Sequence, residues 1–187
     1  YGPDGGQYVA PYDKMVMEEV RKIETVDEVK FDGNEALIEK IGEELDNKYL
    51  DELVKLSVSK EAIKRQHDLS IVFSPIHGTG GVLVPPVLER YGFTNVTLVE
   101  EQMVVDGNFP TVVYPNPEEK EALTMAMNKA KEIDAELVMA TDPDSDRIGI
   151  AVKDDKGEWV LFNGNMTGTL IINYMLTAWK EAGKLKG

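Results

Sequence analysis

Three aspartates at alternate positions are the residues of this chain best suited to chemistry. Asp142, Asp144 and Asp146 directly follow a short apolar run that is typical of a buried strand. Without a counter-ion, carboxylates so close together repel one another and bind protons more readily. A hard divalent cation removes this repulsion and binds through oxygen ligands. We therefore predict that the loop turns its three carboxylates inward and holds one metal ion.

Three other interpretations of the acidic loop compete with a metal site. A calcium-binding EF-hand needs glycine at the sixth loop position and glutamate at the twelfth, and counting from Asp142 these positions hold Arg147 and Lys153. A phosphatase of the haloacid dehalogenase type also places an acidic pair after an apolar strand, but it usually has Thr or Val where Asp146 stands. An exposed acidic turn without a ligand is the third interpretation, and it stays open beside the metal site.

The apolar pattern predicts the elements that position this loop. Strands are expected at 69–73, 94–99, 135–141, 148–152 and 159–162, and helices at 13–23 (with Asp13 as N-cap), 35–45, 49–56, 60–66, 82–91, 118–133 and 166–180. Strands that alternate with helices indicate βαβ units and thus an α/β fold, a three-layer sandwich with a mainly parallel sheet. Ligands of such sheets bind at the carboxyl ends of the strands, so loops 74–81 and 142–147 should share one edge.

Composition excludes several classes of function. The chain has 187 residues, 42% of them hydrophobic, and a formal net charge of -14. This charge argues against binding to nucleic acid or to an anionic membrane surface. The sequence has no cysteine, no long apolar run and no signal peptide, so we expect a cytoplasmic protein. It opens without methionine in a turn-like stretch, which predicts a piece of a longer protein.

The acidic loop also resembles a known family. Residues Thr141 to Gly149 are similar to the metal-binding loop of the α-D-phosphohexomutases, the phosphoglucomutase and phosphomannomutase family, which reads Asp-Gly/Pro-Asp-Gly/Ala/Ser-Asp-Arg. Four further parts of the chain resemble segments of this family in the same order, namely Tyr1 to Gln7, Phe73 to Gly81, Asp106 to Pro110 with Pro115 to Glu118, and Asn163 to Asn165 with Gly168.

The resemblance implies a domain organisation and a reaction. Residues 1–33 would be the end of domain I and a linker, 34–162 would be domain II, and 163–187 would begin domain III. In this family a phosphoserine donates its phosphoryl group to a hexose 1- or 6-phosphate. The resulting hexose 1,6-bisphosphate reorients and returns the other phosphoryl group. The parent enzyme would thus be an intramolecular phosphotransferase, an isomerase of glucose or mannose phosphates.

The same resemblance assigns roles to residues. Asp142, Asp144 and Asp146 would bind Mg²⁺, and Arg147 would support catalysis by neutralising the carboxylates or by reaching the phosphoryl group. The alternative interpretation is that Arg147 simply pairs with an aspartate. The partners implied are hexose phosphate, hexose 1,6-bisphosphate and the other domains of the same chain.

The family's phosphoserine segment, sugar-specifying loop and final phosphate-binding loop do not occur in this sequence. The chain alone is therefore expected to be inactive, since neither Ser74 nor Ser145 lies in a suitable context. The alternative is a free-standing metal- or nucleotide-binding α/β module without catalysis. Near Ser74, we favour a tight turn over a phosphate cradle for Gly78, Gly80 and Gly81, and a structural role over substrate contact for His77.

Overall fold

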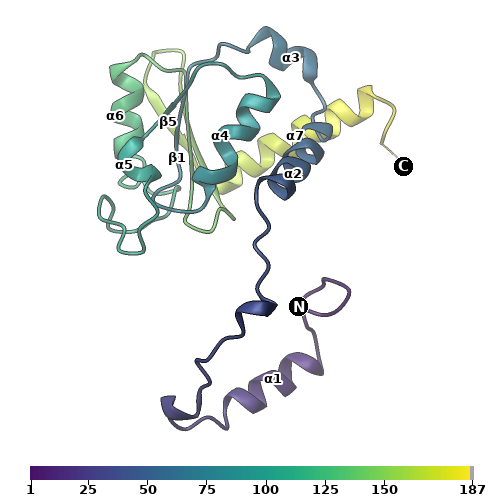
Figure 1. The fold of residues 1–187 in the computed structure, drawn as a ribbon. Coiled ribbons are helices and arrows are strands. Elements are labelled where there is room, and N and C mark those ends of the chain that lie inside the picture. Colours follow the sequence, from purple (N-terminus) through teal and green to yellow (C-terminus); the bar gives the residue numbers. More distant parts are fainter. Residues whose placement is uncertain (186–187) are drawn as a thin grey trace. The chain divides into compact units, whose positions relative to one another are not determined.

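Short helical segments joined by extended chain make up the first of two compact units, residues 1–41. The computed structural model describes residues 1–185 (Figure 1). Helix α1 (Tyr12–Val20) begins one residue before the predicted start, so Pro11 is its N-cap and Asp13 lies in its first turn. An acidic side chain in the first turn stabilises a helix through the backbone dipole. Asp13 therefore favours the start of this helix although it is not the N-cap.

The predicted helix at 35–45 is wrong. A single 3-10 turn, η2 (Glu35–Leu37), occupies its start, and a separate helix, α2 (Glu43–Lys55), begins after Gly42. The apolar side chains that suggested the helix, Leu37 and Ile41, are exposed. A helix of this length needs an apolar face packed against a partner, and none of these side chains has one among the described residues.

The second unit, 42–187, carries the sheet. A short 3-10 turn, η1 (Val26–Glu28), belongs to the first unit, and the remaining elements follow α2 along the chain. They are α3 (Lys60–Arg65), β1 (Ile71–Ser74), α4 (Gly80–Tyr91), β2 (Val96–Leu98), α5 (Glu100–Met103), α6 (Thr124–Glu132), β3 (Leu137–Thr141), β4 (Ile148–Lys153), β5 (Trp159–Phe162) and α7 (Gly164–Glu181).

Five strands form one sheet in the order β2-β1-β3-β4-β5. Strand β1 is parallel to both β2 and β3, with Ser74 opposite Ala140 near the carboxyl ends. Strands β4 and β5 are antiparallel additions that form the predicted hairpin around residues 154–157. The α/β class is confirmed, and the sheet is mixed because the hairpin extends its parallel part.

Helices cover both faces of the sheet, as expected for three layers. On one face, Ala126 and Ala130 of α6 pack in a core cluster with Val72 and Val138 of the central strands. On the other face, Leu88 of α4 lines an apolar cavity with strand residues, among them Ile71, Leu137 and Met139. Figure 1 shows α6 and α4 on opposite sides of the strands. The central strands β1 and β3 are thus buried from both sides, which explains their nearly continuous apolar sequence.

Side-chain hydrogen bonds shift one helix boundary. The predicted helix at 118–133 begins only at Thr124, because the preceding residues form turns. Asn116 accepts a hydrogen bond from the Glu118 N–H group, and the Glu121 carboxylate accepts one from Val113. Such local bonds offer the backbone an alternative to the helix.

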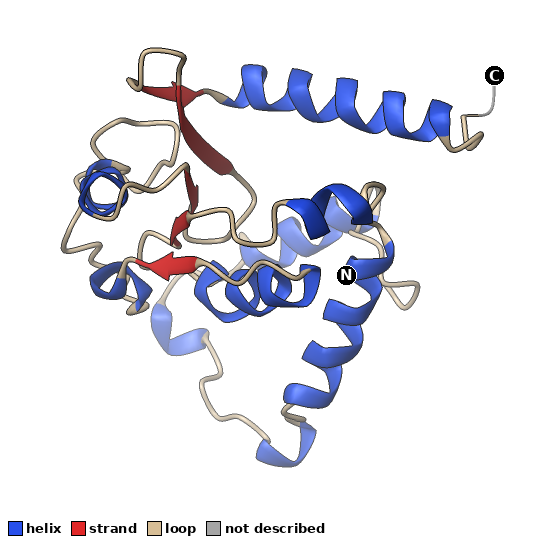
Figure 2. Ribbon diagram, turned by 90° about the horizontal axis from the view of Figure 1, so that it is seen from above, coloured by secondary structure: helices blue, strands red, loops and turns tan. Residues whose placement is uncertain are grey.

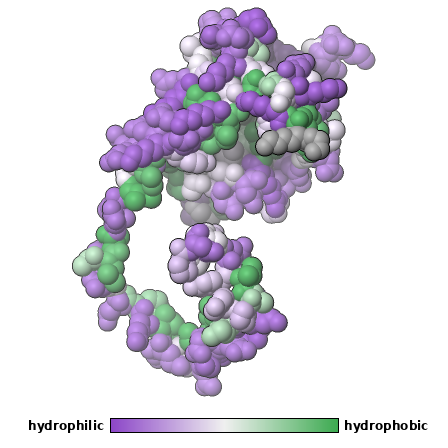
Figure 3. Space-filling model, turned by 90° about the vertical axis from the view of Figure 1, so that its right-hand side faces the viewer, coloured by the Kyte–Doolittle hydropathy of each residue, from purple (hydrophilic) through white to green (hydrophobic). Residues whose placement is uncertain are grey.

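Helix α7 follows β5 and ends at Glu181, four residues before the end of the described chain (Figure 2). It starts two residues before the predicted 166, because the Asn163 side chain accepts a hydrogen bond from Met166 N–H and so caps it. None of the helices in residues 1–185 combines the length and apolar character that a membrane crossing requires. The surface seen in Figure 3 is largely hydrophilic, in keeping with the net charge of -14.

Candidate metal centre

The acidic loop, residues 142–147, joins two strands that are direct neighbours. Strands β3 and β4 are antiparallel, and Thr141 before the loop is paired with Ile148 after it. Both ends of the loop are therefore fixed by the sheet. This differs from a strand-to-helix loop, which is attached to the sheet at one end only.

The structure brings the three predicted ligands together. One carboxylate oxygen each from Asp142, Asp144 and Asp146 can be chosen so that all three lie within 4.8 Å of one another. Asp142 is buried, and the other two are exposed. Three hard oxygen donors converging from one side fit Mg²⁺ or Ca²⁺, which prefer such ligands and complete their shell with water or substrate oxygens. Metal binding itself stays a prediction.

Hydrogen bonds within the loop hold it in a closed turn. The Ser145 N–H group donates to the Asp142 carbonyl at 3.0 Å, and the Arg147 N–H group donates to Asp142 Oδ1 at 3.0 Å. Ser145 has a φ of 62°, in the left-handed region that short polar residues tolerate better than bulky ones. The buried carboxylate of Asp142 is therefore oriented by the backbone on the far side of the loop.

Arg147 lies beside two of the carboxylates. Its Nε atom is 3.8 Å from Asp142 Oδ2 and 3.7 Å from Asp146 Oδ1, and about half of the side chain is exposed. These distances match the expected pairing with aspartates and a partial neutralisation of the loop. Contacts this long and this exposed are weak, so the guanidinium group can be redirected at little cost.

The turn between β1 and α4 (residues 75–79) packs directly against the acidic loop. The backbone N–H group and the hydroxyl group of Thr79 both donate to the Pro143 carbonyl oxygen, at 2.9 and 3.1 Å. A Cβ atom on Gly78 would lie 2.6 Å from the same oxygen, and one on Gly80 would lie 2.8 Å from Ser145 Oγ. The two loops share one edge of the sheet as predicted, and the glycines permit their close approach. This supports the tight-turn interpretation over a phosphate cradle.

His77 is a structural residue, as favoured from the sequence. It is 2% exposed, and its Nδ1 and Nε2 atoms are each 2.8 Å from a partner, the Val104 carbonyl and the Thr111 hydroxyl group. Since a carbonyl can only accept, Nδ1 carries a hydrogen, and in the neutral ring Nε2 accepts from Thr111. Both ring nitrogens are thereby satisfied inside the protein.

A buried chain of hydrogen bonds extends from His77 back to β1. The Gln102 side chain donates to Thr111 Oγ1 at 2.9 Å and accepts from Ser74 Oγ at 2.6 Å. This network holds Ile76 and His77 at φ angles of 47° and 62°. For residues other than glycine such angles cost on the order of 1–3 kcal/mol each, so they persist only where the surroundings impose them.

Three residues important to this arrangement were not singled out in the sequence: Thr79, Gln102 and Thr111. Thr79 stands inside the segment Phe73 to Gly81 that carried the family resemblance, but a threonine before two glycines has no distinctive chemistry on its own. Gln102 is completely buried in the short helix α5, which the pattern did not predict. No sequence signal identifies a buried glutamine before its partners are known.

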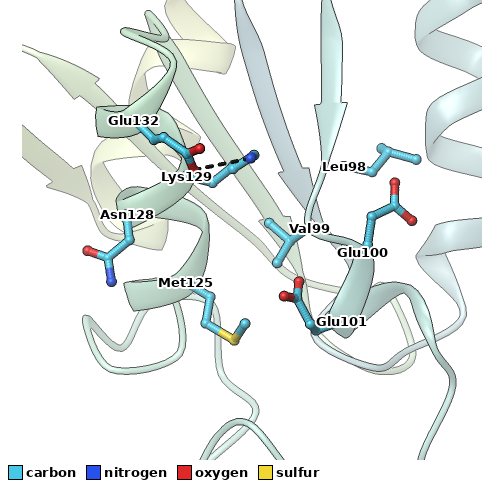
Figure 4. Close-up of a pocket in the computed structure, with 8 residues that line it drawn as sticks. All are labelled: Leu98, Val99, Glu100, Glu101, Met125, Asn128, Lys129 and Glu132. Atoms are coloured by element: carbon cyan, nitrogen blue, oxygen red, sulfur yellow. Dashed lines mark hydrogen bonds and ion pairs between the residues drawn. The ribbon is translucent and has the colours of Figure 1, made fainter.

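A cavity of about 400 Å³ lies between the end of β2 and α6, away from the acidic loop (Figure 4). Leu98, Val99 and Met125 line it together with Glu100, Glu101 and the ion pair between Lys129 and Glu132. None of the predicted metal ligands belongs to this cavity. The candidate site thus lies outside this cavity.

Comparison with known proteins decides what kind of domain carries this loop. Residues 47–157 match the family model described as phosphoglucomutase/phosphomannomutase, alpha/beta/alpha domain II. The chain belongs to the phosphoglucomutase/phosphomannomutase family. The match spans the complete βαβ part of the sheet and the acidic loop, so the family resemblance and the α/β fold are both confirmed.

Curated proteins also match most of the chain. It is 36% identical over 176 residues to a phosphoglucomutase of Staphylococcus haemolyticus, covering 94% of this chain and 32% of that protein. It is 33% identical over 176 residues to a probable phosphomannomutase of Haemophilus influenzae, covering 91% of this chain and 34% of that protein. It is 32% identical over 187 residues to a human phosphopentomutase, covering 97% and 30%. The chain spans about a third of the length of these relatives.

Proposed function

We propose that this chain supplies the magnesium-binding domain of a phosphosugar mutase that interconverts hexose 1-phosphate and hexose 6-phosphate. The observation that carries the proposal is the convergence of carboxylate oxygens from Asp142, Asp144 and Asp146 within 4.8 Å, on a loop of the matched family domain. Relatives named for glucose, mannose and pentose phosphates all match the chain. This supports a role in the phosphoryl chemistry common to them, and not in the choice of sugar.

The residues of the acidic loop divide this work. Asp142, Asp144 and Asp146 would hold the ion, with Asp142 kept in place by the Arg147 N–H group. Bound Mg²⁺ would neutralise negative charge on the phosphoryl oxygens, which is the main electrostatic requirement of phosphoryl transfer. The exposed Arg147 guanidinium group, held only by long contacts, is placed to turn from the aspartates to an incoming phosphoryl group.

The domain organisation follows from the same proposal. Residues 1–33 would end domain I, 34–162 would form domain II, and 163–187 would begin domain III. The family model spans 47–157, inside the middle segment, which supports this division. The partners would be the other domains of the same enzyme, hexose phosphate and hexose 1,6-bisphosphate.

The chain alone should not turn over substrate. None of Ser57, Ser59, Ser70, Ser74 or Ser145 lies in the phosphoserine context of the family. Positioning of reactants contributes roughly 7–11 kcal/mol to many catalysed reactions, and the sugar-orienting loops are not in this sequence. Metal binding needs only the acidic loop and so should survive in this chain.

Two measurements test the proposal. Titration of the chain with Mg²⁺ in a calorimeter should show one weak site, and the triple variant with Asp142, Asp144 and Asp146 changed to Asn should show none. A mixture of the chain, Mg²⁺, glucose 1-phosphate and a trace of glucose 1,6-bisphosphate should yield no glucose 6-phosphate. Equal Mg²⁺ binding by both proteins, or turnover above that of the triple variant, would contradict it.

A further inference from the structure

We infer that Thr79 is a positioning residue for the acidic loop, which it orients through the carbonyl group of Pro143. The effect of Thr79 on metal binding rests on the proposed function. Its structural effect, control of the loop by a residue of the neighbouring βα turn, rests only on the hydrogen bonds of Thr79.

The first argument is the unusual use of Thr79 at the start of a helix. It is the N-cap of α4, a position at which threonine ordinarily accepts a hydrogen bond from its own helix. Here the side chain makes no such bond. Its hydroxyl group instead donates to Pro143 O at 3.1 Å, beside the 2.9 Å bond from its N–H group. The hydroxyl group of Thr79 therefore bonds to the acidic loop and not to its own helix.

The second argument is the place where these bonds act. The Pro143 carbonyl belongs to the peptide group that leads into Asp144, the central residue of the proposed ligand set. Among the hydrogen bonds of the described residues, none involves Asp144 itself, whereas Asp142 is held by Ser145 and Arg147. The two hydrogen bonds from Thr79 therefore fix the peptide group between Pro143 and Asp144, and the Asp144 side chain extends from this fixed group.

The third argument is that the turn presenting Thr79 is itself rigid. Gly78 N–H donates to the Pro75 carbonyl at 2.9 Å, and the His77 ring is bonded on both nitrogens inside the protein. The positive φ angles of Ile76 and His77 lie in this turn. Backbone strain retained beside a candidate site is an observation that points to a positioning role.

A closely matched control exists in the same chain. Thr94 also donates from both its N–H and its hydroxyl group to one distant carbonyl, that of His67, at 2.8 and 3.2 Å. This pair joins the segment before β2 to the segment before β1, outside the acidic loop. Thr79→Val and Thr94→Val therefore remove the same kind of hydrogen bond, and Thr79→Ser restores the hydroxyl group at the site.

The experiment has two independent readouts. Without metal, amide hydrogen exchange of Ser145 and Arg147 should be about tenfold faster in Thr79→Val, because the closed turn depends on the clamp, whereas the amides of β3 should exchange as before. Thr79→Val should bind the paramagnetic probe Mn²⁺ about tenfold more weakly than the unmodified chain. Mutation of residues that orient metal ligands typically lowers metal affinity by this factor or more. Thr79→Ser and Thr94→Val should behave like the unmodified chain in both measurements.

Unchanged exchange at Ser145 and Arg147 in Thr79→Val would overturn the inference, whatever the Mn²⁺ result. Equal losses of Mn²⁺ affinity in Thr79→Val and Thr94→Val would also overturn it, because the effect would then be one of general stability. If the unmodified chain bound no Mn²⁺, the proposed function would fail, and the exchange measurement would still decide the role of Thr79.

Discussion

Gly78 lies so close to Pro143 that a single added methyl group would collide with the backbone of the acidic loop. The built Cβ position is 2.6 Å from the Pro143 carbonyl oxygen and 2.8 Å from the carbonyl carbon. A flexible side chain at that place would give way, but a backbone carbonyl held by two hydrogen bonds from Thr79 cannot. Because of this contact, neither the βα turn nor the acidic loop can move without displacing the other.

Gly78→Ala should therefore destabilise the protein and displace the loop. We expect a loss of about 1–3 kcal/mol in the free energy of unfolding, the usual effect of overpacking. Urea denaturation measures it. Gly107→Ala is the matched control, because a Cβ atom there meets nothing within 4 Å and its φ is not in the left-handed region. A stability for Gly78→Ala equal to that of the control would show that the loops yield easily.

The two histidines of the chain should respond very differently to substitution. His77→Ala removes one hydrogen-bond partner each from the Val104 carbonyl and the Thr111 hydroxyl group and leaves a buried void. We expect a loss of about 2–4 kcal/mol in the free energy of unfolding. His67 is exposed, so His67→Ala should change the free energy of unfolding by no more than about 0.5 kcal/mol. Similar denaturation midpoints for the two variants would contradict the buried network.

Asp144→Asn should weaken Mg²⁺ binding without weakening the fold. The side chain is exposed and makes no hydrogen bond among the described residues, so we expect its removal to change the free energy of unfolding by less than about 0.5 kcal/mol. Loss of one charged ligand should lower Mg²⁺ affinity at least tenfold in calorimetry, while Asp155→Asn, in the hairpin turn, should leave it unchanged. In the proposed parent enzyme, Asp144→Asn should lower turnover. An unfolded variant, or one with full Mg²⁺ affinity, would identify the loop as merely structural.

A pH dependence is expected at the opposite end of β3. The pKa of Asp134 is lowered because Lys153 donates a hydrogen bond to its carboxylate and attracts it electrostatically. A lowered pKa in the folded state favours folding when the carboxylate is ionised. The contribution is thus present above the ordinary aspartate pKa of about 4 and disappears as the pH falls through the folded-state value.

Asp134→Asn should accordingly be slightly less stable than the unmodified chain at pH 7 and indistinguishable from it in acid. Asparagine tolerates the φ of 55° found at this position, so the substitution adds no backbone strain. Thermal denaturation between pH 7 and about pH 3 provides the test. A stability difference that stayed constant over this range would exclude the ion pair as its cause.

The central strands could be predicted because burial on both faces leaves them little freedom in sequence. Ile71, Val72 and Phe73 are all buried, and an apolar run of this kind between turns is a strong signal. The prediction of a helix at 35–45 failed because helical spacing identifies an apolar face but does not show whether another element packs against that face. Leu37 has the right spacing, but it is 83% exposed.

The acidic loop could be predicted for a different reason. Its three ligands are adjacent in sequence, so their chemistry is visible without a fold. The residues that hold the loop are not adjacent to it: Thr79 lies 64 positions from Pro143. Their roles depend on the pairing of β1 with β3, and such contacts cannot be inferred from local patterns.

The direct connection of β3 to β4 has a consequence for changes in chain length. Thr141 and Ile148 are cross-strand partners, so only the six residues of the acidic loop separate two paired strands. An inserted residue would either shift the pairing and turn the side chains of β4 to the wrong face, or separate Pro143 from Thr79. The length of this loop is therefore constrained by the fold, in addition to the constraint that metal binding would place on its aspartates. The turn at residues 154–157 also joins two paired strands, but it is exposed and, within the described chain, none of its hydrogen bonds reaches another element, which makes it the place in this domain to attach a fluorescent label or a peptide tag.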